Sequence, residues 1–180
     1  RLVLVNLVGN ALKFARPGVA PLVHIEAAQA DGLHQIRVSD NGVGIAPAHQ
    51  QAIFRILDYR VAPGGKALIA PDCGEIAHNT QVLDLNSDGV PEVLVTAGNG
   101  CTSGHIGASV FLFVKNAEGR YTQQLGFPGA GVTPLPTRTR GWQDLRIGTT
   151  GFCEPVWAWK GAAYDLHCSV ETQRGGCRDL

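Results

Sequence analysis

The sequence predicts an α+β chain: a short helix-and-strand piece over residues 1–56, then a disulfide-bonded, mainly antiparallel β domain over residues 57–180. Three observations lead to this class. Helical spacing of apolar residues is confined to the first part of the chain. Glycine and tryptophan become more frequent after residue 57. All five cysteines lie at or after Cys73, which is typical of a part that folds in an oxidising compartment.

Charge and hydropathy exclude several classes of function. Fifteen basic and fifteen acidic residues cancel, so nothing predicts binding to nucleic acid or to an anionic membrane. No apolar run is long enough to cross a bilayer, so we predict no membrane span, and a protein partner stays unknown. The chain begins with Arg1 and has no signal peptide, which we interpret as an internal piece of a longer protein.

Residues 1–16, RLVLVNLVGNALKFAR, predict a helix that ends before Pro17-Gly18. At about 100° per residue, its apolar residues cover nearly the whole surface, which is typical of a buried helix. Asn6, Asn10 and Lys13 form a polar stripe on the remaining face. Because asparagine is unfavourable inside a helix, the stripe is expected to face polar groups that satisfy its hydrogen bonds. A solvent-facing edge is the alternative.

Two strands follow, over residues 22–30 and 33–39, with a turn at Asp31-Gly32. The second strand leads into DNGVGIAP, in which Gly42 and Gly44 let the backbone approach a flat ligand. Asp40, at the strand end, can accept a hydrogen bond from an exocyclic amine. Alone, this pattern also suits an ordinary turn. Ala46-Pro47 then begins another helix.

NLVGNALKF, DNGVGIAP and QQAIF, in this order and spacing, resemble the N, G1 and F boxes of the ATP-binding catalytic domain of sensor histidine kinases, a family that shares its fold with gyrase B. The resemblance covers residues 1–56 and implies an incomplete α/β sandwich. It implies that Asn10 holds Mg²⁺ and that Asn6 and Lys13 lie near the phosphates. It also implies that Asp40 accepts from the adenine amino group, with Gly42 and Gly44 lining the base and Phe54 packing under the lid.

The rest of the family's nucleotide site is not found after Phe54. The family continues with a glycine-rich segment whose backbone N–H groups hold the triphosphate. Residues 63–69, PGGKALI, lack that pattern and predict an ordinary turn. None of the six histidines stands in a stretch like the family's phosphoacceptor. We therefore expect weak or absent binding of ATP and Mg²⁺, and no turnover in two-component phosphoryl transfer.

Residues 81–98, QVLDLNSDGVPEVLVTAG, predict a calcium loop between two strands. Oxygen donors alternate around Gly89, which suits a hard cation that takes six to eight oxygens. The stretch resembles the loops of FG-GAP/VCBS repeats. A metal-free turn is the alternative. The expected Ca²⁺ ligands are Asp84, Asn86, Asp88, the Val90 carbonyl and Glu92. A weaker match of residues 89–98 with 141–150 suggests two related strand units, of which the second has lost its ligands.

The cysteines predict two disulfides. In GFCEPVWAWKGAAYDLHC, a two-residue turn at Lys160-Gly161 sets Cys153 opposite Cys168, close enough to bond. Cys73 and Cys101 flank the calcium loop and are expected to pair, which leaves Cys177 over. The alternative is zinc held by these two cysteines with His78 and His105, although the spacing is less compact than in zinc fingers.

Two functions follow, from different classes. The first is a composite chain, or chimera: a partial nucleotide module that does not turn over, joined to a non-catalytic, calcium-binding β domain. The alternative is a secreted or periplasmic binding or structural protein, stabilised by calcium and with no nucleotide role. The first part is of a cytoplasmic type and the second of a periplasmic or secreted type. Trp157 and Trp159 on one strand face predict core packing, with a carbohydrate or partner platform as the alternative.

Overall fold

The computed structural model describes residues 2–30 and 33–178, and at residues 2, 3, 6, 30, 33–35 and 47 it describes the backbone alone. The predicted turn at Asp31-Gly32 lies outside the described residues. By contacts within the chain, the protein divides into two compact units, residues 1–46 and 47–180. The sequence-based boundary lies ten residues later, after residue 56, and stays a prediction.

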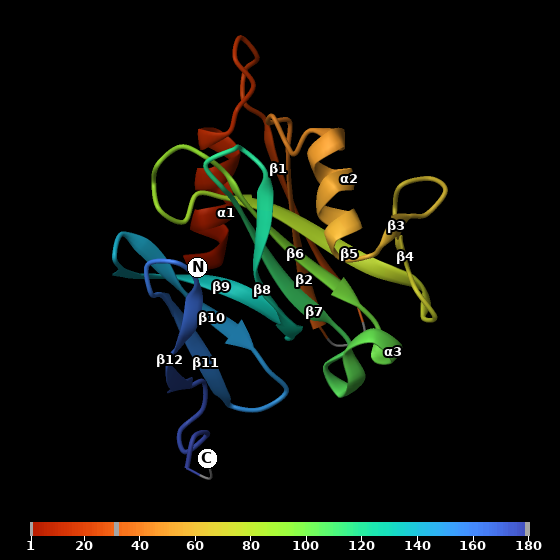
Figure 1. The fold of residues 1–180 in the computed structure, drawn as a ribbon. Coiled ribbons are helices and arrows are strands. Elements are labelled where there is room, and N and C mark those ends of the chain that lie inside the picture. Colours follow the sequence, from red (N-terminus) through yellow and green to blue (C-terminus); the bar gives the residue numbers. More distant parts are fainter. Residues whose placement is uncertain (1, 31–32, 179–180) are drawn as a thin grey trace. The chain divides into compact units, whose positions relative to one another are not determined.

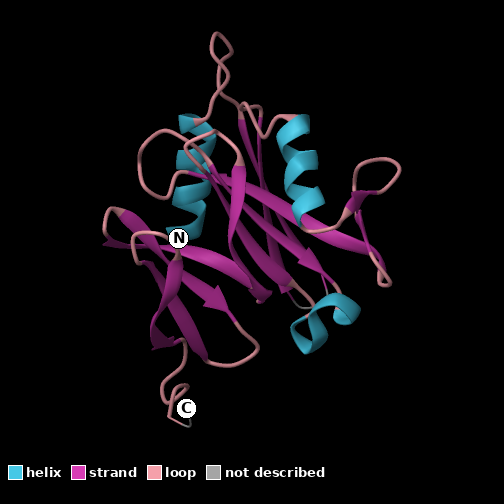
Figure 2. Cartoon of the chain, in the orientation of Figure 1, coloured by secondary structure: helices cyan, strands magenta, loops and turns pink. Residues whose placement is uncertain are grey.

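The predicted fold class is wrong. Of the residues that the structure describes, 48% are in strands and 15% in helices, and the strands form three antiparallel sheets. The chain is therefore mainly β rather than α+β (Figure 2). An α/β sandwich needs a sheet of several strands beneath its helices. In the first unit only two strands pair with each other, and the strands that follow pair among themselves in other sheets. The expected incomplete sandwich is therefore not the architecture formed.

The first unit holds helix α1 (Leu2–Lys13) and the hairpin of β1 (Val23–Ala30) and β2 (Leu33–Asp40). The hairpin pairs Val23 with Asp40 and Ala30 with Leu33, so the register is the one that a two-residue turn sets. Helix α1 contacts both strands. The predicted helix and the two predicted strands are confirmed as elements.

The second unit begins with α2 (Pro47–Ile56) and contains a six-stranded and a four-stranded sheet (Figure 1). The larger has the strand order β3-β4-β5-β6-β7-β8 and the smaller β12-β11-β10-β9. Strands of the larger are β3 (Arg60–Val61), β4 (Leu68–Ala70), β5 (Gly74–Leu83), β6 (Glu92–Gly98), β7 (Ser109–Lys115) and β8 (Tyr121–Pro128). Those of the smaller are β9 (Gly131–Thr139), β10 (Trp142–Gly148), β11 (Cys153–Trp159) and β12 (Tyr164–Glu171). A short helix α3 (Gly100–Ser103) and a 3₁₀ turn η1 (Gly104–Ile106) join β6 to β7.

Strands β6 and β7 are buried on both faces. Their sequences EVLVTAG and SVFLFVK are nearly continuous apolar runs, as expected of strands that are covered on two sides. One face contributes Leu94, Val110 and Leu112 to a core cluster that also contains Leu145 and Ile147 of β10. The two sheets therefore bury one shared core. Trp157 and Trp159 pack against this core, Trp157 stacking on Phe127 and Trp159 on Trp142.

Helix α2 covers the other face of the six-stranded sheet. Ile53 and Phe54 are buried, and the Phe54 ring meets His78 of β5 edge to face at 5.4 Å. Tyr59, just after the helix, makes the same kind of contact with Phe111 of β7. The family pattern expected Phe54 to lie under a nucleotide lid, but in this structure its side chain is part of the β unit's packing.

Candidate functional site

Asp40 to Gly44, at the end of β2, fold back onto the end of α1. The backbone N–H of Val43 donates to the Phe14 carbonyl at 2.8 Å, and Arg16 Nε donates to the Gly42 carbonyl at 2.8 Å. Gly42 is buried, and a Cβ there would lie 2.6 Å from the Phe14 oxygen, so only glycine fits. Asp40 Oδ1 accepts from the Gly42 N–H at 2.8 Å. The G1-like loop and the N-box-like helix are therefore brought together.

The side chains expected to hold nucleotide are placed as follows. Asn10 is half-buried on α1, whereas Lys13 and Asp40 are exposed. Gly44 takes a positive φ of 58°, which glycine adopts without strain. Asn6 lies on α1, but its side chain is outside the described part. These positions do not test nucleotide binding, so the roles assigned to the six residues stay predictions.

Apolar side chains of this unit remain open to solvent. Leu12 is 53% exposed, Leu22 66% and Ile36 60%, although each belongs to or adjoins a helix or strand. Ala11 is the one buried hydrophobic residue among the described side chains of the unit. The helix and hairpin thus keep the apolar surface that a larger sheet would cover.

The acidic loop between β5 and β6 folds around its own side chains. Asp84 Oδ2 accepts from the Gly89 N–H at 3.1 Å, and Asn86 Oδ1 accepts from the Asp88 N–H at 3.0 Å. Asp88 Oδ1 in turn accepts from the Val90 N–H at 2.7 Å. Gly89, at φ 83°, permits the sharp turn that the sequence predicted.

Glu92 closes this loop from the first position of β6. Its Oε2 accepts from the Leu85 N–H at 2.7 Å, and its side chain is 1% exposed. Burial raises the pKa of the Glu92 carboxyl to about 7, and the negative charges of Asp88 and Asp84 act in the same direction against the stabilising hydrogen bond from Leu85. This carboxylate is poorly compensated, so a cation beside it would be favourable.

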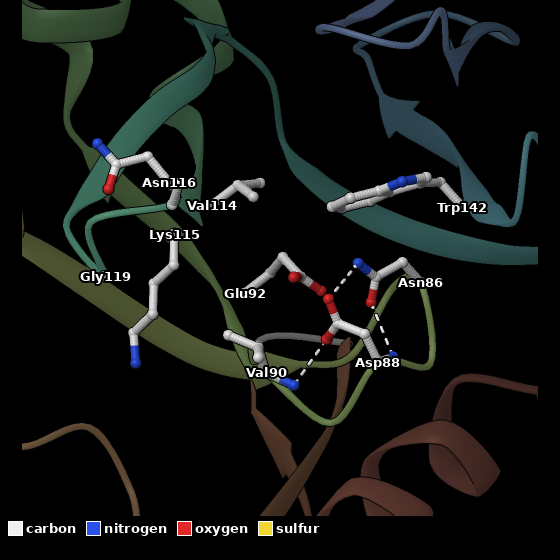
Figure 3. A pocket seen from close by; sticks show the side chains of 10 residues that line it. Asn86, Asp88, Val90, Glu92, Val114, Lys115, Asn116, Gly119 and Trp142 are labelled. Carbon is white, nitrogen blue, oxygen red and sulfur yellow. Dashed lines mark hydrogen bonds between the residues drawn. The ribbon is translucent and has the colours of Figure 1, made fainter.

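A pocket of about 460 Å³ opens beside the loop (Figure 3). Asn86, Asp88, Val90 and Glu92 form one wall, and Trp142 of β10 forms another. Strand β7 contributes Val114 and Lys115, and the β7–β8 turn contributes Asn116, Ala117 and Gly119. Four of the five predicted calcium ligands therefore line one pocket. The sequence did not single out Trp142, Lys115 or Asn116, because their strands are distant along the chain.

Calcium binding is not shown by this geometry. Within residues 2–30 and 33–178, no group of three or more His, Cys, Asp or Glu side chains is gathered closely enough to hold a metal ion. Oxygens of Asp84, Asp88 and Glu92 instead accept from backbone N–H groups of the loop. The donor set is chemically suited to Ca²⁺, but the ligand assignment stays a prediction.

One predicted disulfide is confirmed and the other is wrong. Cys73 is bonded to Cys101, so these two thiols are not zinc ligands. Cys153 is bonded to Cys177 rather than to Cys168, which is free and exposed. The reason is the register: four residues, Lys160–Ala163, separate Trp159 from its partner Tyr164, and a bulge follows at Val156/Trp157. Both changes move Cys168 opposite Val156 and Cys153 opposite Glu171.

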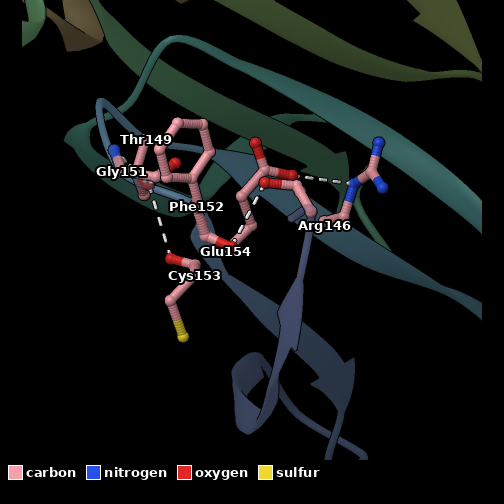
Figure 4. Close-up of polar contacts among 7 residues, drawn as sticks. Arg146, Thr149, Gly151, Phe152, Cys153 and Glu154 are labelled. Atoms are coloured by element: carbon pink, nitrogen blue, oxygen red, sulfur yellow. Dashed lines mark hydrogen bonds and ion pairs between the residues drawn. The ribbon is translucent and has the colours of Figure 1, made fainter. Parts of the chain in front are cut away.

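The end of β11 that carries Cys153 is held by polar contacts (Figure 4). Glu154 pairs with Arg146 of β10 at 3.0 Å, and the Thr149 hydroxyl donates to the Cys153 carbonyl at 3.4 Å. These contacts explain how this edge is ordered. These contacts do not bring a nucleophile and a general base together.

Comparisons with known proteins bear on the first half of the chain. Residues 1–90 match the family described as histidine kinase-, DNA gyrase B- and HSP90-like ATPase. Drug sensory protein A of Synechocystis sp. is 37% identical over 67 residues, which cover 33% of this chain and 10% of that protein. The chain therefore spans about a tenth of the length of this relative. No solved structure matches the chain. Among the described residues, no helix has the length and apolar character to cross a membrane.

Proposed function

The chain belongs to the histidine kinase-, DNA gyrase B- and HSP90-like ATPase family, and from that premise we propose a composite function. Residues 1–56 are a partial nucleotide-binding module of histidine-kinase type that does not turn over ATP. Residues 57–180 are a non-catalytic β domain that a calcium ion stabilises. The family generally binds ATP and Mg²⁺, whereas the calcium role comes from the acidic loop alone.

The observation that carries the nucleotide part is the closure of the Asp40–Gly44 loop on α1. The close approach of Gly42 to the Phe14 carbonyl supports a backbone shaped for contact with a flat base. Asp40 would accept from the adenine amino group beside Gly42 and Gly44. On α1, Asn10 would hold Mg²⁺ through its side-chain oxygen, and Asn6 and Lys13 would lie near the phosphates. Bound Mg²⁺ neutralises phosphate charge.

The proposal of no turnover rests on the segment after α2. In kinases of this family a glycine-rich segment supplies N–H groups to the triphosphate, as helix N-termini commonly do. Here the chain continues from α2 into β3. The Ala62 N–H donates to the Ala67 carbonyl across a turn at residues 62–67, so it is not available to a phosphate. Leu68 and Ala70 of β4 are then buried in the six-stranded sheet. This segment is committed to β structure.

Titration of the full chain with Mg-ATP in a calorimeter tests the nucleotide part. We expect a dissociation constant well above the micromolar range and no phosphate release above the uncatalysed rate. Any residual binding is expected to fall in Asp40→Asn and to persist in Asp72→Asn, an exposed carboxylate of the other unit. Micromolar, Mg²⁺-dependent affinity or measurable turnover would contradict the proposal.

The calcium part is supported by the charge of the loop. Asp84 and Glu92 are buried, and Asp88 adds a third carboxylate within the same nine residues. Bringing a divalent cation to these oxygens removes their mutual repulsion. Full-length protein with Asp88→Asn is expected to bind Ca²⁺ at least about tenfold more weakly than the unchanged chain, as measured by calorimetry. Unchanged affinity in this variant would exclude the loop as the site.

A second candidate function is a calcium-stabilised binding or structural protein of an oxidising compartment, with no nucleotide role. Two disulfides in the second unit favour it, because such bonds persist outside the reducing cytosol. The β domain is then of periplasmic or secreted type and the first segment of cytoplasmic type. A non-reducing mass measurement on protein isolated from its native source should show two disulfides and one free thiol. Five free thiols would argue against this location.

A further inference from the structure

Strands of both sheets begin or end at the pocket beside the loop of residues 84–92. Glu92 is the first residue of β6, Lys115 is the last residue of β7 and Trp142 is the first residue of β10. These three residues line the cavity, whose volume is about 460 Å³. Small-molecule sites are commonly concave, with an apolar or aromatic wall and a few polar groups that fix the ligand. The cavity has this form, and the proposed function assigns a ligand only to its acidic wall.

Glu92 gives the cavity a carboxylate whose charge is not neutralised. Its side chain is 1% exposed. The donors to this carboxylate are backbone N–H groups, that of Leu85 at 2.7 Å and its own. No ion pair of the described residues includes Glu92. Because burial of a charge is costly unless the charge is paired, a cationic group in the cavity would be favourable.

The cationic side chain of the wall, Lys115, does not neutralise Glu92. Its Nζ lies over the Tyr121 ring, 5.2 Å from the ring centroid, and Figure 3 shows it directed away from the Glu92 and Asp88 carboxylates. No ion pair within the described part of the chain includes Lys115. The other lining residues carry no positive charge. The cavity is therefore acidic, with one buried carboxylate, Glu92, and one exposed carboxylate, Asp88.

Trp142 gives the cavity a fixed aromatic wall. One face of its indole stacks on Trp159, with the ring centroids 4.3 Å apart, and Tyr164 contacts the ring edge to face at 6.2 Å. Figure 3 shows the indole nearly edge-on, across the cavity from Lys115. Val114 adds an apolar surface. An indole face attracts a cation that lies within about 6 Å of the ring, so this wall and the two carboxylates favour the same charge.

We propose that this cavity binds a small organic cation, namely a primary ammonium group carried on an apolar body. The ammonium group donates charge-assisted hydrogen bonds to the Glu92 carboxylate, and Asp88 adds negative charge. The apolar body of the ligand lies against Trp142 and Val114. A neutral ligand, such as a saccharide, would contact the same walls but would leave the buried charge of Glu92 unpaired. This inference goes beyond the proposed function and requires no calcium.

The test compares benzylamine with benzyl alcohol, two probes of nearly the same shape of which only the amine is charged. Calorimetry on the full chain is done at pH 8, where the Glu92 carboxyl with its pKa of about 7 is ionised. The buffer contains EDTA, because Ca²⁺ would compete for the same carboxylates. Benzylamine is expected to bind at least about tenfold more tightly than benzyl alcohol, since hydrogen bonds to charged groups are the stronger ones. Methyl β-glucoside, as a neutral saccharide probe, is expected to bind more weakly than benzylamine.

Three variants assign the preference for the amine to this cavity. Glu92→Gln keeps the shape of the side chain and should abolish the preference, while unchanged binding of benzyl alcohol reports that the cavity is intact. Asp88→Asn should reduce the preference by a smaller factor, because the Asp88 charge is exposed and screened by solvent. Glu118→Gln is the matched control. It removes the same charge from an exposed carboxylate of the β7–β8 turn that does not line the cavity, so the preference should persist.

Each outcome decides the inference without deciding the calcium proposal, which has its own titration. Equal binding of the two benzyl probes, binding of neither, or tighter binding of methyl β-glucoside would overturn the inference. An undiminished preference for benzylamine in Glu92→Gln would also overturn it. If Glu92→Gln loses both benzyl probes, Asp88→Asn decides: a reduced preference in this variant supports the inference, and a preference equal to that of the unchanged chain overturns it.

Discussion

The two units differ in how many motif residues and how many buried side chains they contain. In residues 2–46, the motif residues are clear, yet Leu12, Leu22 and Ile36 stay more than half exposed. Residues 47–178 contain few motif residues, yet the side chains of β6 and β7 are buried on both faces of the sheet. A family can thus be identified from a region that contributes little buried surface, while the stability of the chain comes from a region with a weaker signature.

The largest expected difference is between two leucines. Leu112→Ala removes a fully buried side chain from the core shared by the two sheets and should lower the free energy of unfolding by about 3 to 5 kcal/mol. Leu12→Ala truncates a side chain that is 53% exposed on α1 and should change it by less than about 0.5 kcal/mol. Urea denaturation measures both. Equal effects would contradict the contrast.

Removal of the Cys73–Cys101 bond is expected to have the next largest effect. The bond closes a loop with a sequence separation of 28. By the chain-entropy estimate, the double variant Cys73→Ser, Cys101→Ser should lose about 3 to 4 kcal/mol of unfolding free energy. Cys168→Ser, at the free exposed thiol, serves as the control and should leave stability unchanged. A loss in Cys168→Ser comparable to that of the double variant would instead indicate that Cys168 is bonded.

Two glycines of the first unit predict smaller and opposite effects. At Gly9 of α1, an added Cβ meets nothing within 4 Å, so Gly9→Ala should stabilise the helix by about 0.5 to 1 kcal/mol. At Gly42 it would meet the Phe14 oxygen at 2.6 Å, so Gly42→Ala should open the loop. Hydrogen exchange of the α1 amides reports both changes. Slower exchange in Gly42→Ala than in the unchanged chain would contradict the close approach.

The smallest expected effect is a pH dependence at His78. Burial lowers the pKa of this imidazole, so the folded state favours the neutral form. Its contribution to stability is fully present above the unfolded pKa of about 6.5 and is lost as pH falls from there toward the lower folded pKa. The melting temperatures of the unchanged chain and of His78→Gln, measured between pH 7.5 and 5, should therefore approach each other as the pH falls. A constant difference between the two melting temperatures would show that this ring is not protonated in that range.

The sequence located local elements better than it located the fold. The helix of residues 2–13 and the register of the first hairpin follow from apolar periodicity and from the length of the Asp31-Gly32 turn. The fold class failed because the family resemblance implied a sandwich, whereas the strands after residue 56 pair among themselves. Helix α2 shows the same limit, since nothing local predicts that Phe54 packs on His78 of β5.

The candidate site shows a similar division. The alternation of oxygen donors around Gly89 was readable because all of them lie within nine residues. The walls of the adjacent pocket, Trp142 and Asn116, were not, because they depend on how distant strands meet. The predicted pairing of Cys153 with Cys168 was wrong because of the strand register. The longer turn and the bulge together shift the register of β11 and β12 by three positions. Register errors of this kind cannot be resolved without knowing the turn.

The central claim is that the β unit, and not the nucleotide segment, governs the ligand response of the folded chain. The most direct test is a thermal melt of the full chain, alone, with Ca²⁺ and with Mg-ATP. At a Ca²⁺ concentration about 100 times its dissociation constant, binding adds about 2.7 kcal/mol, which should raise the melting temperature by roughly 5 to 10 °C. Mg-ATP should leave it unchanged. A rise with Mg-ATP and none with Ca²⁺ would contradict the account.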